Sequence, residues 1–193
     1  DMHDKKMGFA VLNTGIREYE AMDNGERSLA ITLLRAFTYR NCPIFGRWEV
    51  YPEMELAQCI GKHEWTYAIY PHTGDWTNGV YTEAEDLNVP LEAAQAGPHK
   101  GTLPKAMSFV ELKGNNLQIS TLKRAEDRPG SYIVRVFNPT DKAVNGSIVL
   151  HKKPKRAWFT NLNEDRQKEI KPVTKEIKIS VGKKKVVTIE FER

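Results

Sequence analysis

The pattern of hydrophobic and polar residues predicts β-strands along most of the chain. Residues 8–15, GFAVLNTG, form an apolar run that ends in a turn. Residues 18–37 carry two further runs that flank Asp23-Asn24-Gly25. Because Asn and Gly tolerate the positive φ angles of a tight turn, this segment is typical of a β-hairpin. The chain is therefore expected to open with a strand and a hairpin.

The next segments predict an irregular region and then a strand. Residues 38–60 show no period and hold several Pro and Gly residues, so we expect irregular structure there. In residues 64–70, aromatic and β-branched residues alternate with period two. We therefore predict a strand over 64–70, with Pro71 as its stop.

One short helix is predicted near residues 77–88. Apolar residues recur there at helical spacing, and Asp75 or Thr77 can cap the first turn. The Asn-Val-Pro sequence at 88–90 ends the helix, because a residue before Pro disfavours the helical conformation.

Beyond residue 101 the pattern changes to short strands separated by turn sequences rich in Gly, Pro, Asn and Asp. The predicted strands are 106–112, 117–125, 131–138, 146–153, 156–162, 176–181 and 186–192. Short strands at this spacing are typical of a β-sandwich. We place a domain boundary near residue 108 and predict an all-β chain with two domains, 1–108 and 109–193.

Positive charge is concentrated late in the chain, which has a formal charge of +4 and a pI near 9.0. The basic runs are HKKPKR at 151–156 and GKKK at 182–185. Such runs can bind nucleic acid, but neither is interleaved with aromatic residues. Lys residues on strand edges also discourage pairing between sheets. We favour this second interpretation and expect no nucleic-acid partner.

Composition and cysteine usage indicate a globular chain of a reducing compartment. No run of 18 apolar residues occurs, so we expect no membrane partner. As free thiols, Cys42 and Cys59 fit the cytoplasm, while a disulfide between them stays open from sequence. Residue 1 is Asp rather than Met, and we expect a fragment of a longer chain or a trimmed one.

The stretch HEWTYAIYPHTGDW, residues 63–76, holds the residues most suggestive of a metal site. A zinc-protease helix needs two His residues four apart. Here His63 and His72 flank a predicted strand, which would hold their rings roughly 30 Å apart. We therefore expect no shared metal, and we expect His63, His72 and Asp75 to make the hydrogen bonds of turns and caps.

No constellation for catalysis stands out. Cys42 has no His nearby in the sequence and no GxSxG motif occurs, so nucleophilic catalysis is not indicated. Glu83, Glu85 and Asp86 lie together on the predicted helix, where a solvated face explains them. We predict no catalytic and no metal-binding residue in this chain.

Arg35 is the residue that we single out for binding. It ends a strand face that is otherwise apolar, formed by Leu29, Ile31 and Leu33. It can pair with a nearby carboxylate or stack on an aromatic ring, and the residue pattern favours this interpretation. Its guanidinium can also bind a sugar hydroxyl or a carboxylate.

Aromatic residues raise a second possibility, a surface on which sugar rings stack. Trp48, Trp65, Tyr67 and Trp76 are the candidates, although aromatic residues at strand spacing belong more often to a core. An exposed platform of Trp48, Trp65 or Trp76 would favour a carbohydrate-binding module. Burial of all three would favour a scaffold.

Several motifs, in order, resemble one family. The first part carries GFAVLNTG, LAITLLRAF, GKHEWTYAIYPHTGDW and LNVPL, and the second carries ISTLKRAED, SYIVRVFNPT, AWFTNLNED and KKVVTIEF. Their order and spacing resemble the C-terminal region of family 38 glycoside hydrolases across essentially the whole chain. These are the α-mannosidases, including the bacterial branch that is similar to mannosylglycerate hydrolases.

The resemblance implies a fold and a missing partner. The first part would be the end of a mutarotase-like β-supersandwich, and the second would be a small C-terminal β-sandwich. The family's retaining mechanism uses an aspartate nucleophile, an acid/base carboxylate and a divalent metal, usually zinc, bound by His and Asp. Those residues would belong to an N-terminal catalytic domain that is not in this chain, so no cofactor is expected here.

The resemblance also implies a role. The chain would be inactive alone, would pack on the catalytic domain and would complete the cleft for a mannoside substrate. Arg35 matches the Arg at the end of the LLR strand and becomes the one substrate-binding candidate. Cut from its parent, such a piece would expose a sheet edge and an apolar face, so we expect self-association into a homo-oligomer. The alternative is a free-standing carbohydrate-binding β-sandwich module.

Overall fold

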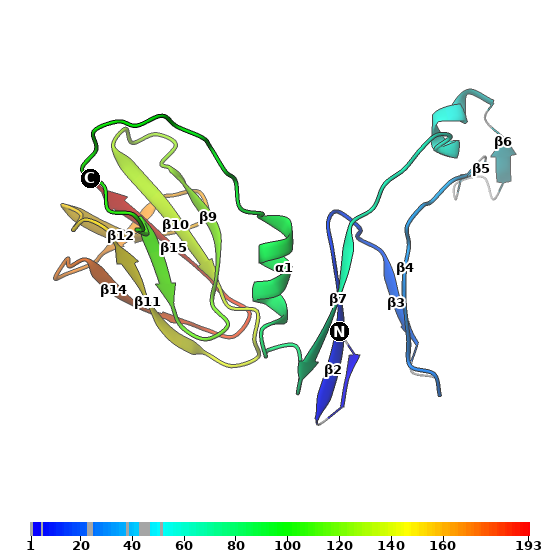
Figure 1. Cartoon of the computed structure of the whole chain (residues 1–193), viewed down its shortest axis with the longest axis horizontal. Coiled ribbons are helices and arrows are strands. Elements are labelled where there is room, and N and C mark those ends of the chain that lie inside the picture. Colours follow the sequence, from blue (N-terminus) through cyan, green and yellow to red (C-terminus); the bar gives the residue numbers. More distant parts are fainter. Residues whose placement is uncertain (1, 5, 23–24, 38, 43–46, 51) are drawn as a thin grey trace. The chain divides into compact units, whose positions relative to one another are not determined.

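The chain forms two compact units, Asp1–Glu92 and Ala93–Arg193 (Figure 1). The structure, a computed structural model, describes residues 2–4, 6–22, 25–37, 39–42, 47–50 and 52–193, with the backbone alone for 3, 39–42, 47–50 and 52–54. Both units consist mainly of β-strands, which confirms the predicted all-β class. Residues 93–109 hold no strand or helix, and the boundary expected near residue 108 stays a prediction.

An antiparallel sheet of three strands is the centre of the first unit. Its strands are β1 (Met2–His3), β2 (Met7–Asn13) and β7 (Tyr67–Thr73), in the order β1-β2-β7. Side chains of β2 and β7 alternate between a buried and an exposed face. Met7, Phe9, Tyr67 and Ile69 lie on the exposed face and are 39 to 65% exposed. One apolar face of this sheet is therefore open to solvent.

Strand β7 continues through a proline. The expected strand over 64–70 with Pro71 as its stop is wrong, because β7 includes Pro71 and ends at Thr73. The hydrogen bond from Gly74 N to Lys6 O, 3.1 Å long, shows which cross-strand pairs of β2 and β7 are hydrogen-bonded. Because these pairs alternate along an antiparallel ladder, Phe9 and Pro71 form a non-hydrogen-bonded pair, and the nitrogen of Pro71 points away from β2. Since β7 lies at the edge of the sheet, the missing N–H costs no bond of the ladder.

His72 and Gly8 make a close contact on the buried face of the sheet. They are cross-strand partners, and a Cβ added at Gly8 would lie 2.0 Å from Cε1 of His72. Any residue other than Gly at this position would displace the ring. The ring of His72 also stacks on Tyr70, with 5.9 Å between the centroids. His72 is thus part of the packing of the first unit.

Helix α1 (Val80–Asn88) packs beside β2. Val80, Ala84 and Leu87 are its partly buried residues, as their spacing predicts. At its end, Nδ2 of Asn88 donates to the carbonyl of Asn13 at 3.2 Å, which ties the helix to the end of β2. Within the described part of the chain, no helix is both long and apolar enough to cross a membrane.

The start of α1 differs from the expectation, while its end agrees. The N-cap is Gly79 in a left-handed conformation, φ 92°, and it makes no side-chain cap bond. Asp75 accepts a hydrogen bond from the backbone N of Thr77 at 2.9 Å, which closes a turn before the helix. The cap expected from Asp75 or Thr77 is therefore wrong.

The predicted hairpin of the first unit is confirmed in β3 (Tyr19–Met22) and β4 (Ser28–Ile31). Asp23 and Asn24 of its turn lie outside the described residues. Strand β4 ends at Ile31, so the strand face expected to continue through Leu33 to Arg35 is not formed.

The region expected to be irregular contains regular structure. It holds a second hairpin, β5 (Tyr39–Cys42) with β6 (Arg47–Val50), and the 3-10 helix η1 (Pro52–Gln58). The expectation for 38–60 is therefore wrong. YRNC in β5 shows no alternation, and the alternation of RWEV in β6 spans four residues, the shortest run that indicates a strand.

The second unit is an antiparallel β-sandwich. One sheet has the order β13-β12-β15-β10-β9 and the other has the order β14-β11-β8. The strands are β8 (Val110–Lys113), β9 (Gln118–Arg124), β10 (Ser131–Phe137), β11 (Val144–Leu150), β12 (Arg156–Thr160), β13 (Arg166–Glu169), β14 (Glu176–Val181) and β15 (Val186–Glu192). All seven predicted strands are present. Strand β13 is additional, and its sequence, RQKE, has no apolar residue to reveal it.

The core of this unit lies between the two sheets. Apolar residues alternate along the central strands and face inward. The core residues are Leu117, Val134, Val136, Ile148, Ala157, Ile177, Ile179, Val181, Ile189 and Phe191. Each fully buried Val or Ile stabilises the fold by roughly 1.5–3 kcal/mol. The sandwich therefore has a hydrophobic core of its own.

Candidate functional site

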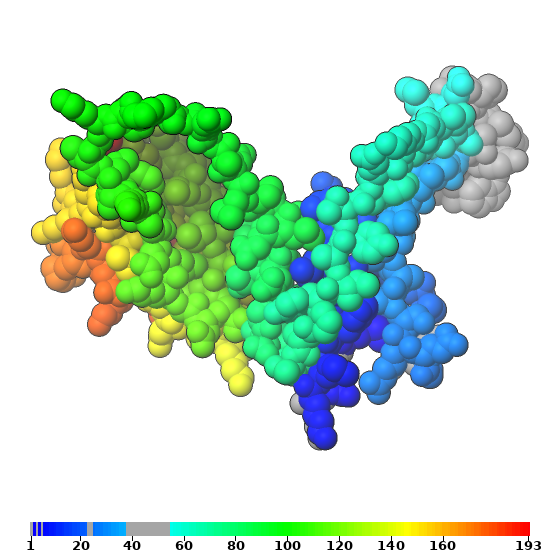
Figure 2. Space-filling model, viewed as in Figure 1, coloured from blue at the N-terminus to red at the C-terminus, as the bar shows by residue number. Residues whose placement is uncertain are grey.

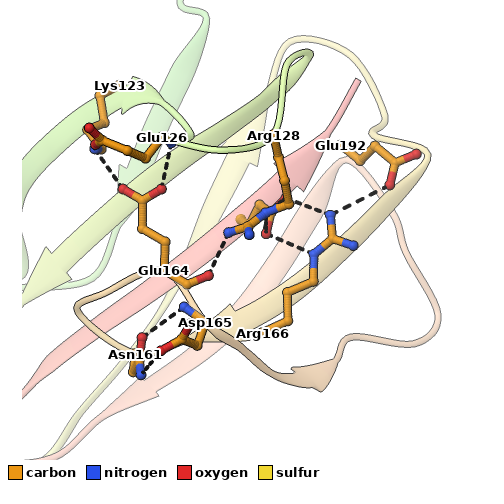
Figure 3. A network of polar contacts seen from close by, with 9 residues as sticks. Lys123, Glu126, Arg128, Asn161, Glu164, Asp165, Arg166 and Glu192 are labelled. Atoms are coloured by element: carbon orange, nitrogen blue, oxygen red, sulfur yellow. Dashed lines mark hydrogen bonds and ion pairs between the residues drawn. The ribbon is translucent and has the colours of Figure 1, made fainter.

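A buried carboxylate lies on the central strand of the five-stranded sheet. Glu190 of β15 is 0% exposed, although its neighbours Ile189 and Phe191 show that it points away from the core. A charge in such a place costs several kcal/mol unless it is paired. Figure 3 shows the network of polar contacts that surrounds this position.

Two arginines neutralise Glu190. Arg128, from the turn between β9 and β10, donates from Nε to both carboxylate oxygens at 3.0 Å. Arg166 of β13 donates from Nε at 2.9 Å and from Nη2 at 2.7 Å, a two-pronged contact. The carboxylate is thus held from two sides by elements that are distant in sequence.

A second carboxylate extends the network. Glu164, 6% exposed, accepts from Nζ of Lys123 at 2.7 Å and from the backbone N of Glu126 at 2.9 Å. Its carbonyl oxygen accepts from Nη2 of Arg128 at 2.6 Å. Arg128 therefore joins the two carboxylate residues into one network. Figure 3 shows its contact with Glu164.

Trp158 of β12 is the apolar part of this arrangement. The guanidinium carbon of Arg166 lies 3.5 Å from a ring centroid of Trp158, and that of Arg156 lies 4.6 Å away. Cations at these distances are attracted to the ring face. Arg156 also donates to Glu169 at 3.0 Å. The outer face of the sheet is therefore covered by paired arginines and an indole.

The protonation states argue against acid/base work by these carboxylates. Burial raises the pKa of Glu190, but hydrogen bonds from Arg166, Ser131 and Arg128 outweigh it and leave the pKa below its ordinary value. Hydrogen bonds from Lys123 and from the Glu126 backbone lower the pKa of Glu164. A general acid near neutral pH needs a raised pKa instead. Both carboxylates therefore stay ionised at neutral pH, each paired with the cations beside it.

Sequence reasoning did not find this network. In VVTIEFE, Glu190 occupies a position that alternation assigns to solvent. Its partners Arg128 and Arg166 lie in a turn and in the unpredicted strand β13. The one available signal was the number of charges in LKRAED and LNEDR, which does not specify who pairs with whom.

Arg35 has the contacts that its residue pattern favoured. Its Nη1 lies 3.5 Å from a carboxylate oxygen of Glu18, and its guanidinium carbon lies 6.0 Å from the ring centroid of Phe37. The side chain is 74% exposed, so the ion pair is worth little by itself. A role in substrate binding stays a prediction.

The structure gives the two histidines of the opening motif separate partners. Nε2 of His63 lies 2.5 Å from the carbonyl oxygen of Cys59, and its ring stacks on Trp65. His72 packs on Gly8, as described above. Asp75 closes the turn with Thr77. Among the described residues, no three His, Cys, Asp or Glu side chains gather as metal ligands would.

The tryptophans considered for sugar stacking differ in how far they are exposed. Trp65 is 38% exposed, Trp76 is partly buried with its ring edge-on to Tyr81, and the Trp48 side chain lies outside the described residues. Tyr67 is 54% exposed. The described candidates are therefore not all buried, and a surface for sugar stacking stays a prediction. Cys59 is a free thiol in the structure, and the side chain of Cys42 lies outside the described residues.

The charged runs are mainly on the surface. Glu83, Glu85 and Asp86 are exposed on α1, which agrees with a solvated helix face. In the run 151–156, only Pro154 is buried. The run 182–185 forms the turn between β14 and β15. Exposure of both runs leaves the expectation of no nucleic-acid partner a prediction.

Comparisons with known proteins agree with the motifs. Residues 116–189 match the model of the glycosyl hydrolases family 38 C-terminal beta sandwich domain. A curated protein of Halalkalibacterium halodurans, named "Putative mannosylglycerate hydrolase", is 28% identical over 186 residues, which are 96% of this chain and 19% of that protein. The resemblance to the C-terminal region of family 38 glycoside hydrolases is confirmed.

The fold has a counterpart among solved structures. The crystal structure of an alpha-mannosidase from Enterococcus faecalis V583 matches with a TM-score of 0.76 and 22% identity, over 99% of this chain and 20% of that one. The chain thus spans about one fifth of the length of the proteins it resembles. A free-standing carbohydrate-binding module is not favoured by these matches.

Replacing Glu190 tests the network. Glu190→Gln keeps the size of the side chain but leaves Arg128 without its anion and Arg166 with Glu192 at 3.9 Å, so we expect a loss of about 3 kcal/mol in the free energy of unfolding. The pKa of Glu190 is lower in the fold, so ionisation adds stability that is complete above the ordinary pKa of 4.5 and is lost as pH falls through the folded pKa. Urea titrations from pH 3 to 7 should therefore show a steeper acid loss for the wild type than for Glu190→Gln. The exposed Glu111→Gln is the control, and an equal effect of both variants would contradict the role of Glu190.

His72→Ala tests the interpretation of the opening motif. Removing the ring leaves a gap over Gly8 and should lower the free energy of unfolding by about 1–3 kcal/mol. Metal content, measured by mass spectrometry of the purified chain, should not change. The exposed His99→Ala is the control. Stoichiometric zinc that disappears with His72→Ala would refute the structural interpretation.

Proposed function

We propose that this chain, whose residues 116–189 match the C-terminal beta sandwich domain of family 38 glycosyl hydrolases, is the non-catalytic C-terminal region of an α-mannosidase-type glycoside hydrolase. The observation that carries this proposal is the extent of the matches. They cover nearly all of this chain and about one fifth of each relative. We place the catalytic domain in the remaining four fifths, which have no counterpart here.

The chain would pack on that catalytic domain and help to shape the cleft for the sugar. The sandwich supports this role because it has a hydrophobic core of its own and its buried Glu190 is paired with two arginines, so it can hold a fixed shape. The partners are the N-terminal catalytic domain of the same protein and the mannoside substrate that the two share.

The reaction of the whole protein would be retaining hydrolysis of an α-mannoside through a glycosyl-enzyme intermediate. A divalent metal, with zinc as the first candidate, would be held by His and Asp residues of the catalytic domain. The described residues of this chain offer no group of three such ligands, so no part of the reaction is assigned to a metal on this chain.

Arg35 would contribute to binding of the sugar or of an acidic aglycone. Its guanidinium has five N–H donors, and the contact with Glu18 at 3.5 Å uses one nitrogen. The exposed remainder can donate to hydroxyl or carboxylate oxygens, and Glu18 limits where the side chain can point.

The proposal includes a compartment and a behaviour of the isolated chain. We place the protein in the cytoplasm, since Cys59 is a free thiol and cysteines are few. The exposed apolar side chains of β2 and β7 support self-association of the chain when it is produced alone.

The decisive experiment is hydrolysis of a chromogenic α-mannoside in the presence of zinc or cobalt. We expect turnover by the full-length parent protein and none by this chain, after circular dichroism has shown that the chain is folded. Turnover by the chain alone would place catalytic groups here and would make His63, His72 and Asp75 the first residues to replace.

Replacing Arg35 in the full-length protein tests its role. Losing a charge-assisted hydrogen bond to substrate should lower kcat/KM about tenfold. Arg17→Ala removes an exposed arginine of the same unit and should leave kcat/KM unchanged. Unchanged kinetics in Arg35→Ala would remove this residue from the site.

A further inference from the structure

An apolar groove opens on the inner face of the five-stranded sheet. It has a volume of about 600 Å³ and lies between residues 103–109, the strand β9 and the segment after β11. Figure 2 shows residues 93–109, in green, arching over a hollow in this unit, and Figure 1 shows the same segment on its way to β8. All of its lining residues belong to the second unit.

The groove lies at the β9 edge of the wider sheet. That sheet has five strands, with β9 at its edge, and the other sheet has three. Leu122 of β9 pairs with the core residue Val134 and points to the same face, yet it is 54% exposed. Leu103 and Phe109 partly cover this face and are themselves 69% and 66% exposed. The core of this unit thus continues into an apolar surface that the described residues of the unit itself leave open.

The rim of the groove is cationic. Arg124, Lys152, Lys153 and Arg193 line it, and within the described residues none of them has an acidic partner. Two other charged residues of the lining are already paired, Lys123 with Glu164 and Glu192 with Arg166. The whole unit shares this bias, since residues 93–193 hold 21 of the 29 Lys and Arg but 10 of the 25 Asp and Glu. Unpaired cations around an apolar floor attract a partner that is both acidic and apolar.

We infer that this groove is a docking surface for an acidic segment with apolar side chains in the part of the parent protein that lies outside this chain. The inference rests on the proposed function, which supplies that part. Two observations select this occupant: the complementary charge, and the relatives' length, of which this chain covers about one fifth. The apolar side chains would cover Leu122 and Phe109, and the acidic ones would pair with Lys152 and Lys153.

Charge reversal in the full-length parent protein tests the docking surface. In Lys152→Glu with Lys153→Glu, amide hydrogen exchange of residues 103–109 should become about tenfold faster, because the covering segment is released. Lys183→Glu with Lys185→Glu makes the same charge change in the other basic run, outside the groove, and should leave this exchange unchanged. Equal exchange in both variants would overturn the inference.

A second pair of variants tests the apolar floor. Leu122→Asp should speed exchange in 103–109, whereas Leu162→Asp, at a leucine that is 64% exposed outside the groove, should not. Micromolar dodecanoate should have no effect on the parent, whose groove is already covered. Slower exchange on its addition would overturn the inference in favour of a small anionic amphiphile.

The two levels of the proposal can fail separately. Turnover of an α-mannoside by the parent, with exchange in 103–109 unaffected by any variant, would leave the function standing and overturn the docking surface. No turnover, with exchange that responds to the groove variants alone, would support the docking surface and remove the function.

Discussion

The burial of one carboxylate determines how the outer face of the sandwich is organised. Glu190 lies in the middle of β15, and an unpaired charge there would cost several kcal/mol. The compensating arginines must therefore come from both sides, Arg128 from a turn and Arg166 from the edge strand β13. Once in place, Arg166 also covers Trp158. Paired charges and the indole of Trp158 thus cover the outer face of this sheet at Glu190.

The sequence predicted the elements whose burial alternates and missed those whose role depends on partners. All seven predicted strands of the sandwich exist because their apolar residues share one face. Strand β13 escaped because RQKE has no such face. The sequence pattern singled out Arg35 but not its partner Glu18. The expected strand face ran on to Arg35, whereas strand β4 ends at Ile31. Pairings between distant charges are set by the fold and leave no local pattern.

The two units use their apolar residues differently. In the sandwich, Val134 and Ile148 are buried by the unit itself, and the surface around Leu122 is an exception. In the three-stranded sheet, Phe9 and Ile69 remain exposed on one whole face. The proposed place of this chain in a longer protein would account for such exposed surfaces, since residues outside the chain would then cover them.

The proline in β7 limits how a further strand can pair with the edge of the three-stranded sheet. Backbone groups of Ile69 and Pro71 face outward from the edge, and Pro71 has no N–H to offer. A strand added at this edge can form a full ladder only on the side before Pro71. Two copies that met edge to edge through β7 would each forgo a hydrogen bond. Assembly of copies would then proceed through the exposed face of the sheet, and the edge would resist the fibre-like stacking to which open sheets are prone.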